Sequence, residues 1–514
     1  MRKKFLKACA GIFVVTLGLA FASCDSILGN GGGLEYELID GTYTVVGLGD
    51  YEEGILTIPS KYMGKPVTAI GESAFANEVE IGHLYIPDSV TTIGKGAFYG
   101  CPNLTKVSIG NGVTEISEKA FGYCSMMDTL ELSNSLTTIG DSAFIGCERL
   151  KKFDLPESLE VISDNAFSEC KKIVHLDFGE NLQVIGYRAF YNCLALDEVV
   201  IPDGAPTDIM KEAFYGCEMV QYISLGNDVA CVGNSAFESN GDLRELVIGD
   251  SIVEIGTRAF ASCRKLYSVT LGSSLRSIRS AAFEKCWLIR EIVNSSIIDI
   301  KLGNLEEDGG IGGYAWSVRK KDEPSKIFKG DDELIYYIDG ARKAVVACEL
   351  STHTDLVIPD DVTEIGPYAF YNEQLIMTVT IGKGCTTISN SAFRNSYKIK
   401  SVILGENVTT IENSAFRYVG YLTDIVIGKN ITSVGEQAFK KKVGDKYYKT
   451  YQNVYFQGTE AEWEQVKDLI SLDGANDNEH LLLPTVNVAF YSETAPTVLG
   501  SFWHFVDGKP TLWN

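Results

Sequence analysis

Residues 111–147 have the sequence NGVTEISEKAFGYCSMMDTLELSNSLTTIGDSAFIGC, which holds one repeat unit and most of the next. Phe121 and Phe144 occupy the same position of two successive units. The step between such positions is 23 residues, with one step of 24 between Phe190 and Phe214. The repeated phenylalanines are Phe75, Phe98, Phe121, Phe144, Phe167, Phe190, Phe214, Phe237, Phe260 and Phe283, then Phe370, Phe393, Phe416 and Phe439. A fixed period of this length is typical of a stacked repeat architecture, or solenoid.

Each unit contains the pattern of a short strand with one buried face. In residues 104–109 apolar Leu104, Val107 and Ile109 alternate with polar residues. Residues 113–116 predict a second short extended piece, and residues 118–121 are long enough for one helical turn. Because no unit can bury its own apolar face, we expect the units to stack into one continuous core, with about 4.8 Å per rung.

The strand pattern L-x-x-V/L-x-I/L resembles the strand signature of leucine-rich repeats. The added pattern V-T-x-I-G-x-x-A-F-x-x-C is similar to the units of the BspA-like subclass of bacterial surface leucine-rich repeat proteins. The resemblance covers roughly residues 54–283 and 356–439. It implies a mainly β solenoid of about 14 copies in two blocks, on a scaffold known chiefly as a binding surface with varied ligands.

The period also predicts the domain organisation. We expect a lipoprotein-type signal peptide at residues 1–23, a tether at 24–34, an N-terminal cap at 35–66, a first repeat block at 67–293, a β insertion at 294–355, a second repeat block at 356–457 and a C-terminal cap at 458–514. In the insertion, residues 296–300, 333–338 and 344–348 have strand-like composition, which predicts hairpins. In the C-terminal cap, a short helix is predicted to about residue 469.

The N-terminus has the features of an export signal. Four basic residues within the first seven precede an apolar run at residues 8–22 that is too short to span a bilayer. Phe21-Ala22-Ser23-Cys24 resembles a bacterial lipobox, although Phe21 stands where an aliphatic residue is usual. The resemblance implies a lipid on Cys24 and a cell-surface protein held to the membrane through that lipid alone. The alternative is an ordinary cleaved signal peptide, with Cys24 incidental.

Composition excludes some partners. The chain has 45 basic and 68 acidic residues, a formal net charge of −23 and a pI near 4.7. A nucleic acid or an anionic membrane surface would require a basic face, so neither is expected as a partner. The acidity itself is explained most simply by the solubility of an exported, monomeric solenoid.

Eight of the thirteen cysteines share one position of the unit, three residues after the phenylalanine. They are Cys101, Cys124, Cys147, Cys170, Cys193, Cys217, Cys263 and Cys286. We expect them to be small buried apolar residues at an inner turn, because Asn240, Ser396 and Val419 replace cysteine at the same position. Disulfides between adjacent rungs remain an alternative. No C-x-x-C spacing for zinc is present.

The sequence offers little for catalysis. It has five histidines, no H-E-x-x-H, no G-x-S-x-G and no P-loop, so we expect neither an enzyme nor a cofactor. An enzyme would need its site in the insertion or the C-terminal cap, where Trp316, Trp463 and Trp503 lie.

The candidate ligand face is the outward side of the strand ladder. Its residues are Lys106, Glu131, Lys152, Asp154, His175, Asp177, Glu198, Tyr222 and Glu245. We expect Glu131, Asp154 and Asp177 to lie in one column, where carboxylates about 5 Å apart would repel one another and a Ca²⁺ ion or a cationic ligand would relieve the repulsion. The alternative is a set of solvated acids.

Two ligand classes remain open. The leading hypothesis is an adhesin-like protein that binds extracellular proteins of a host or a neighbouring cell. The second is a surface lipoprotein that captures glycans. Glycans require exposed aromatic platforms, for which Tyr85 and Tyr222 are the ladder candidates.

Overall fold

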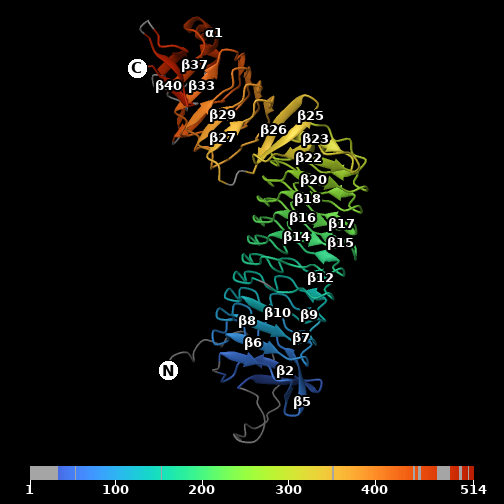
Figure 1. The fold of residues 1–514 in the computed structure, drawn as a ribbon. Helices are drawn as coiled ribbons and strands as arrows, with labels where there is room; N and C mark the ends of the chain where they lie inside the picture. The colour runs from blue at the N-terminus through green and yellow to red at the C-terminus, as the bar shows by residue number, and fades with distance from the viewer. Residues whose placement is uncertain are drawn as a thin grey trace, which may run out of the picture.

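The computed structural model describes residues 33–51, 54–151, 153–349, 352–443, 446–449, 453–471, 487–496, 500–507 and 509–513. The predicted signal peptide, Cys24, most of the tether and Lys152 lie outside these ranges. The described chain forms a long, mainly β solenoid in two blocks whose axes meet at an angle at the insertion (Figure 1). The predicted fold class is therefore confirmed. None of the described helices is long and apolar enough to cross a membrane.

One side of the solenoid is a ladder of parallel strands to which most units contribute one strand. In the first block these ladder strands are β3 (Ile55–Thr57), β6 (His83–Ile86), β8 (Lys106–Ile109) and β10 (Thr129–Glu131) in one sheet, and β14 (Glu198–Ile201), β16 (Tyr222–Leu225), β18 (Glu245–Val247), β20 (Ser268–Leu271), β22 (Glu291–Asn294) and β23 (Ser317–Arg319) in another. In the second block they are β27 (Asp355–Ile358), β29 (Thr378–Ile381), β31 (Ser401–Ile403), β33 (Asp424–Gly428), β37 (Asn453–Gln457), β38 (Asn487–Tyr491), β39 (Phe502–Val506) and the antiparallel β40 (Lys509–Leu512).

A second side carries a sheet made largely of two-residue strands. In the first block its strands are β1 (Glu35–Ile39), β2 (Thr42–Gly47), β5 (Lys65–Ile70), β7 (Thr92–Ile93), β9 (Glu115–Ile116), β11 (Thr138–Ile139), β12 (Val161–Ile162), β13 (Val184–Ile185), β15 (Thr207–Ile209), β17 (Val229–Val232), β19 (Glu254–Ile255) and β21 (Ser277–Ile278), with β4 (Lys61–Tyr62) beside β5. In the second block they are β24 (Ile327–Lys329), β25 (Leu334–Asp339), β26 (Arg342–Cys348), β28 (Glu364–Ile365), β30 (Thr387–Ile388), β32 (Thr410–Ile411) and β34 (Ser433–Val434).

The third side is the loop that carries the Ala-Phe pair. The expected helical turn at residues 118–121 is wrong, because the loop is a series of turns with left-handed residues on both sides of the phenylalanine, such as Lys119 (φ 56°) and Tyr123 (φ 58°). The loop amides donate towards the following rung, as Phe121 N does to Ala143 O at 2.8 Å. The ladder amides donate the opposite way, as Thr129 N does to Thr105 O at 3.2 Å. Hydrogen bonds to neighbouring rungs thus replace those of a helix.

The phenylalanines form two stacks at the centre of the molecule. The Phe121 and Phe144 rings are nearly parallel, with centroids 5.4 Å apart, and both side chains are fully buried. The first stack belongs to a hydrophobic core that runs from Val45 to Ile311, and the second to a separate core that runs from Leu334 to Val466. The expected single core is therefore divided at the insertion.

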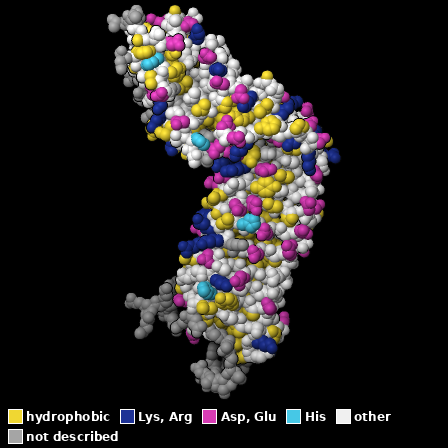
Figure 2. All heavy atoms as spheres, viewed as in Figure 1, with side chains coloured by type: hydrophobic (Ala, Val, Ile, Leu, Met, Phe, Trp, Pro, Cys, Tyr) yellow, Lys and Arg dark blue, Asp and Glu magenta, His cyan; other side chains and the backbone are white. Residues whose placement is uncertain are grey.

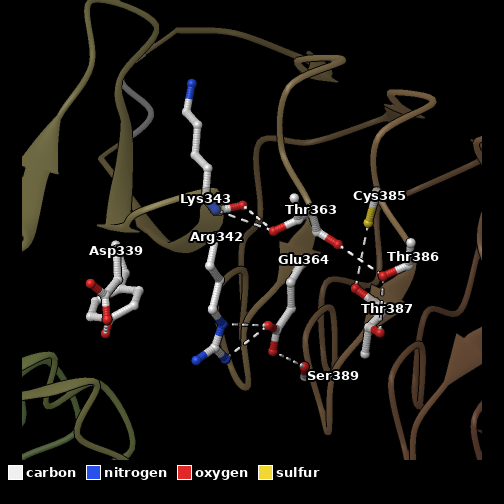
Figure 3. Close-up of polar contacts among 10 residues, drawn as sticks. Asp339, Arg342, Lys343, Thr363, Glu364, Cys385, Thr386, Thr387 and Ser389 are labelled. Atoms are coloured by element: carbon white, nitrogen blue, oxygen red, sulfur yellow. Dashed lines mark hydrogen bonds and ion pairs between the residues drawn. The ribbon is translucent and has the colours of Figure 1, made fainter.

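The insertion extends both blocks. β23 pairs with β22 at the end of the first block, and the predicted hairpin is present as β25 and β26, with Gly340 (φ 60°) in its turn. β26 then pairs with β28, where Arg342 Nη2 lies 2.9 Å from Glu364 Oε2 and Thr363 Oγ1 donates to Lys343 O at 3.0 Å (Figure 3). One expectation fails, because residues 296–300 form no strand. A 3₁₀ helix, η1 (Asp308–Gly313), follows them.

Aromatic side chains also join the two blocks. Trp287, on the last rung of the first block, stacks on Tyr368 of the second block with ring centroids 5.6 Å apart. It also contacts Tyr371 in a T-shaped arrangement with ring centroids 4.8 Å apart. Arg264 lies over the Trp287 ring at 5.9 Å. These contacts bridge the sequence interval that the insertion occupies.

The C-terminal cap contains the predicted helix, α1 (Glu460–Ser471), after ladder strand β37. A two-stranded hairpin, β35 (Lys440–Val443) and β36 (Lys446–Lys449), precedes them. β38 and β39 continue the ladder, and β40 folds back antiparallel on β39.

Candidate ligand-binding face

The ladder face is defined here as the outward side of the ladder strands. Its side chains stand in columns because the strands pair in register. Lys106 pairs with Thr129, Glu198 pairs with Tyr222, and Tyr222 in turn pairs with Glu245. Strands β14, β16, β18 and β20 lie along one side of the first block (Figure 1). Side chains of both charge signs are interspersed along this block, with hydrophobic side chains gathered between them (Figure 2).

The first charged group of the face is an ion pair between adjacent rungs. Lys106 Nζ lies 2.9 Å from Glu131 Oε1 and 5.8 Å from the centre of the Tyr85 ring. The hydrogen bond from Lys106 lowers the pKa of Glu131, and the same bond raises the pKa of Lys106. The negative charge of Glu131 is therefore balanced within the chain.

The second group surrounds His175. Its Nε2 lies 3.0 Å from Asp177 Oδ1, and its Nδ1 lies 3.3 Å from Glu198 Oε1 and 3.6 Å from Asp197 Oδ1. The hydrogen bond to Asp177 and the nearby carboxylates raise the pKa of His175. Asp197 was not among the sequence-predicted residues. The sequence signal that could have identified Asp197 is its position directly before Glu198.

The ladder is interrupted between these two groups. Residues 153–155 and 173–178 are described but are not in strands, so the expected continuous ladder is wrong at two rungs. Phe153 and Phe178 occupy inward positions there, where other units have aliphatic side chains. Phe153 packs on Phe167 at 5.1 Å, and Phe178 packs edge-on against Phe190 at 5.8 Å. Each irregular rung thus has a phenylalanine ring packed against the central stack.

The interruption also affects the proposed calcium column. Asp154 and Asp177 lie on the two irregular rungs, and both are exposed. Within the described ranges, no group of three or more His, Cys, Asp or Glu residues could hold a metal ion. The geometry gives the calcium hypothesis no support.

Beyond His175 the face becomes a regular, partly apolar surface. One column contains Val200, Ser224, Val247 and Thr270, and the neighbouring column contains Glu198, Tyr222, Glu245 and Ser268. Val200 is 39% exposed. Glu198, Tyr222 and Glu245 are candidate ligand-face residues from the sequence, and the alternation of the strands places Val200 and Val247 on the same face.

In the second block the ladder face is closed at its C-terminal end. Trp503 is fully buried against Val426 and Ala489, with Ile403 and Tyr455 at the edge of the cluster. Val426 and Ala489 occupy outward positions of β33 and β38. The longer uncovered part of the ladder face therefore belongs to the first block, while β27–β31 of the second block remain uncovered by this cluster.

The cysteine ladder has a structural role. The thiols of the eight aligned cysteines are buried and donate to the phenylalanine carbonyl of the preceding rung, as Cys101 Sγ does to Phe75 O at 3.1 Å and Cys193 Sγ to Phe167 O at 3.4 Å. The eight aligned cysteines form no disulfide. Burial raises the pKa of Cys217 to about 12, so the buried thiol is protonated. This confirms the expectation of small buried side chains.

The 23-residue units stack into a solenoid with three sides, one of which is a ladder of parallel strands. These features define a solenoid of the leucine-rich repeat class. The model of the BspA-type leucine-rich repeat region matches six copies, at residues 68–197, 183–303 and 346–459. These stretches cover more than half of the chain, and the protein belongs to this family.

Solved structures of leucine-rich repeat proteins are similar at low identity. A protein from Bacteroides ovatus aligns over 89% of this chain and 98% of its own, with 19% identity and a TM-score of 0.45. A leucine-rich cell surface protein from Faecalibacterium prausnitzii aligns over 86% of this chain and 97% of its own, with 20% identity and a TM-score of 0.32. No curated protein matches the chain.

Proposed function

We propose that this protein is a non-enzymatic, adhesin-like binding protein of a bacterial cell surface, anchored through a lipid on Cys24. Its ligand site is the ladder face of the first block, and its ligand is an extracellular protein. The observation that carries the proposal is the surface of β14–β20, where exposed Val200 and partly buried Val247 stand beside Glu198, Tyr222 and Glu245.

The chemistry of this surface suits a protein partner. Protein interfaces combine an apolar centre rich in aromatic residues with a polar rim. Here the column of Val200 and Val247, together with Tyr222, provides the apolar centre. The charged groups on earlier rungs, which are the Lys106–Glu131 ion pair and the His175 group, provide the polar rim. Because the side chains stand on paired strands, little backbone entropy is lost when a ligand binds.

The same groups argue against catalysis. Among the described residues His175 pairs with the carboxylates of Asp177, Asp197 and Glu198, and the aligned cysteines are buried. A histidine that contacts acids alone has no nucleophile to activate. A solenoid with a lipid at one end would instead extend its ladder face away from the membrane.

The proposal is tested by binding of residues 25–514 to immobilised extracellular matrix proteins. The variants are Tyr222→Ala and Val247→Glu on the regular part of the face, and a triple Glu131→Ala, Asp154→Ala, Asp177→Ala variant on its charged part. Arg276→Gln, which removes one exposed charge from the short-strand side, is the matched control.

We expect saturable binding that falls at least tenfold in Val247→Glu and is unchanged in Arg276→Gln. A smaller loss of affinity in the triple variant would indicate that the charged part of the face acts on the orientation of the ligand and its association rate. Failure to bind any matrix protein, or binding that survives Val247→Glu, would overturn the proposed ladder site.

A further inference from the structure

The loop side of the second block differs in charge from that of the first. The residue directly after the repeated phenylalanine forms a column along this side, and in the second block the column contains Tyr371, Arg394, Arg417 and Lys440. In the first block the corresponding positions include Glu238 and Glu284, which both pair with Arg258. The first block therefore balances its loop charges internally.

The positive charges of Arg394 and Arg417 are not balanced in this way. Among the described residues no carboxylate pairs with either guanidinium, and the Nε of each is buried without a hydrogen-bond partner. Their contacts are with one tyrosine. Arg417 Nη2 donates to Tyr418 Oη at 2.8 Å and lies over its ring at 4.6 Å, while Arg394 lies 5.9 Å from the same ring.

The two arginines are neighbours in the stack. They follow Phe393 and Phe416, whose ring centroids are 4.9 Å apart. Two like charges on adjacent rungs repel each other, and an anion placed between them would relieve that repulsion. The planar guanidinium can bind a carboxylate or sulfate through two parallel hydrogen bonds.

Exposed aromatic rings lie beside these cations in the sequence and in the stack. Tyr397 is 45% exposed and Tyr421 is 61% exposed. Their rungs are adjacent, because Tyr421 N donates to Tyr397 O at 3.2 Å. A tyrosine ring offers an apolar face for the C–H groups of a sugar and a hydroxyl for its polar edge.

The basic character continues into the next rung. Tyr418 N donates to Lys440 O at 2.7 Å, which places the start of β35 next to the Arg417 loop. The hairpin of β35 and β36 carries five lysines within residues 440–449. In a chain with a net charge of −23, three successive rungs of the second block therefore have an arginine or lysine directly after the repeated phenylalanine.

We propose that Arg394, Arg417, Tyr397, Tyr418 and Tyr421, named here the arginine–tyrosine face, bind an acidic polysaccharide. The carboxylate or sulfate groups of the polymer bind the guanidinium groups, and its sugar rings stack on the tyrosines. A linear polymer lying along the solenoid axis meets one cation on each of two successive rungs. This site is separate from the ladder face and does not depend on a protein ligand there.

The test uses residues 25–514 and polygalacturonate, with its fully methyl-esterified form as the neutral control of the same sugar backbone. A double Arg394→Gln, Arg417→Gln variant removes the charges. A double Arg394→Lys, Arg417→Lys variant keeps them but removes the planar fork, and a double Tyr397→Ala, Tyr421→Ala variant removes the exposed rings. Arg276→Gln is the control for loss of charge, and poly-glutamate represents an acidic polypeptide.

We expect binding to polygalacturonate that weakens with salt and is absent for the ester. Affinity should fall at least tenfold in the Gln and Tyr variants, partly in the Lys variant and less than twofold in Arg276→Gln. Binding of the ester equal to that of the acid, or full affinity in the Gln variant, would overturn the site. Equal binding of poly-glutamate with no effect of the tyrosine variant would show that the ligand is an acidic polypeptide instead. Unchanged circular dichroism of each variant excludes misfolding as the cause.

Discussion

Trp503 Nε1 donates a hydrogen bond to the carbonyl oxygen of Phe456, 3.1 Å away and 47 residues earlier in the chain. The bond satisfies the one polar atom of an indole that is otherwise buried among Val426, Ala489 and the edge of Tyr455. A residue of the tail thus covers the C-terminal end of the ladder face of the second block, at β33–β38.

Replacement of Trp503 by alanine should release the C-terminal cap. Loss of a large buried side chain costs about 3–5 kcal/mol in a packed core. Because a solenoid can unfold locally, we expect hydrogen–deuterium exchange to rise in β37–β39 while the first block stays protected. Leu512→Ala, at a side chain that is 51% exposed, is the control. Equal exchange in the two variants would contradict the role of Trp503 as the closing residue.

Asn240 is a weak point of the cysteine ladder. It is fully buried, and neither its Oδ1 nor its Nδ2 has a hydrogen-bond partner. Asn240→Cys should restore the thiol bond to the carbonyl of Phe214 and stabilise the protein by about 1–3 kcal/mol, because an unpaired buried polar group costs about that much. The measurement is the urea midpoint of the first block.

A second substitution tests the same type of contact by removing an existing hydrogen bond to the phenylalanine carbonyl. Ser396, at the equivalent position of the second block, donates to Phe370 O at 2.6 Å. Ser396→Ala should destabilise the second block by about 1 kcal/mol. A destabilising Asn240→Cys would show that the amide has a role that the thiol cannot fill.

The His175 group predicts a pH dependence. Its hydrogen bond to Asp177 and the charges of Asp197 and Glu198 raise the pKa of His175 above its ordinary value of 6.5. The stabilisation is therefore fully present below pH 6.5 and is lost as the pH rises through the folded-state pKa. Titration of the histidine signals by NMR should show this pKa, and Asp177→Asn should lower it. No change in Asp177→Asn would disprove the contact.

Thiol reactivity should follow burial. Cys231 is the exposed cysteine among those described, whereas the eight ladder cysteines are buried. In native conditions we expect iodoacetamide to modify Cys231 faster than the ladder cysteines, which should react only after addition of denaturant, because the reagent must reach the sulfur. Peptide mapping by mass spectrometry identifies each site. Native modification of Cys147 at the rate of Cys231 would contradict the closed ladder.

The lipid anchor has a separate test. Cys24→Ser removes the thiol that would carry the diacylglycerol, so the variant should move from the membrane fraction to the soluble fraction. Ser26→Ala, two residues further along, should stay membrane-bound. Retention of Cys24→Ser in the membrane fraction would eliminate lipidation at this residue.

The period of 23 residues was sufficient to predict the solenoid, the two blocks and the buried cysteine ladder. Each rung repeats the same apolar positions, so the buried set follows from spacing alone. The loop conformation was predicted wrongly as helical, because residues such as Lys119 and Tyr123 adopt positive φ only when the next rung supplies the hydrogen-bond partners. Local sequence does not contain those partners.

The sequence by itself determined which residues stand on the ladder face, because strand alternation fixes their side. Only the tertiary structure decided which of them are open, paired or covered. Lys106 pairs with Glu131 and His175 with Asp177, while Trp503 covers the C-terminal end of the second block. Charge balance and coverage depend on distances between side chains on different rungs, and these distances exist only after the units have stacked.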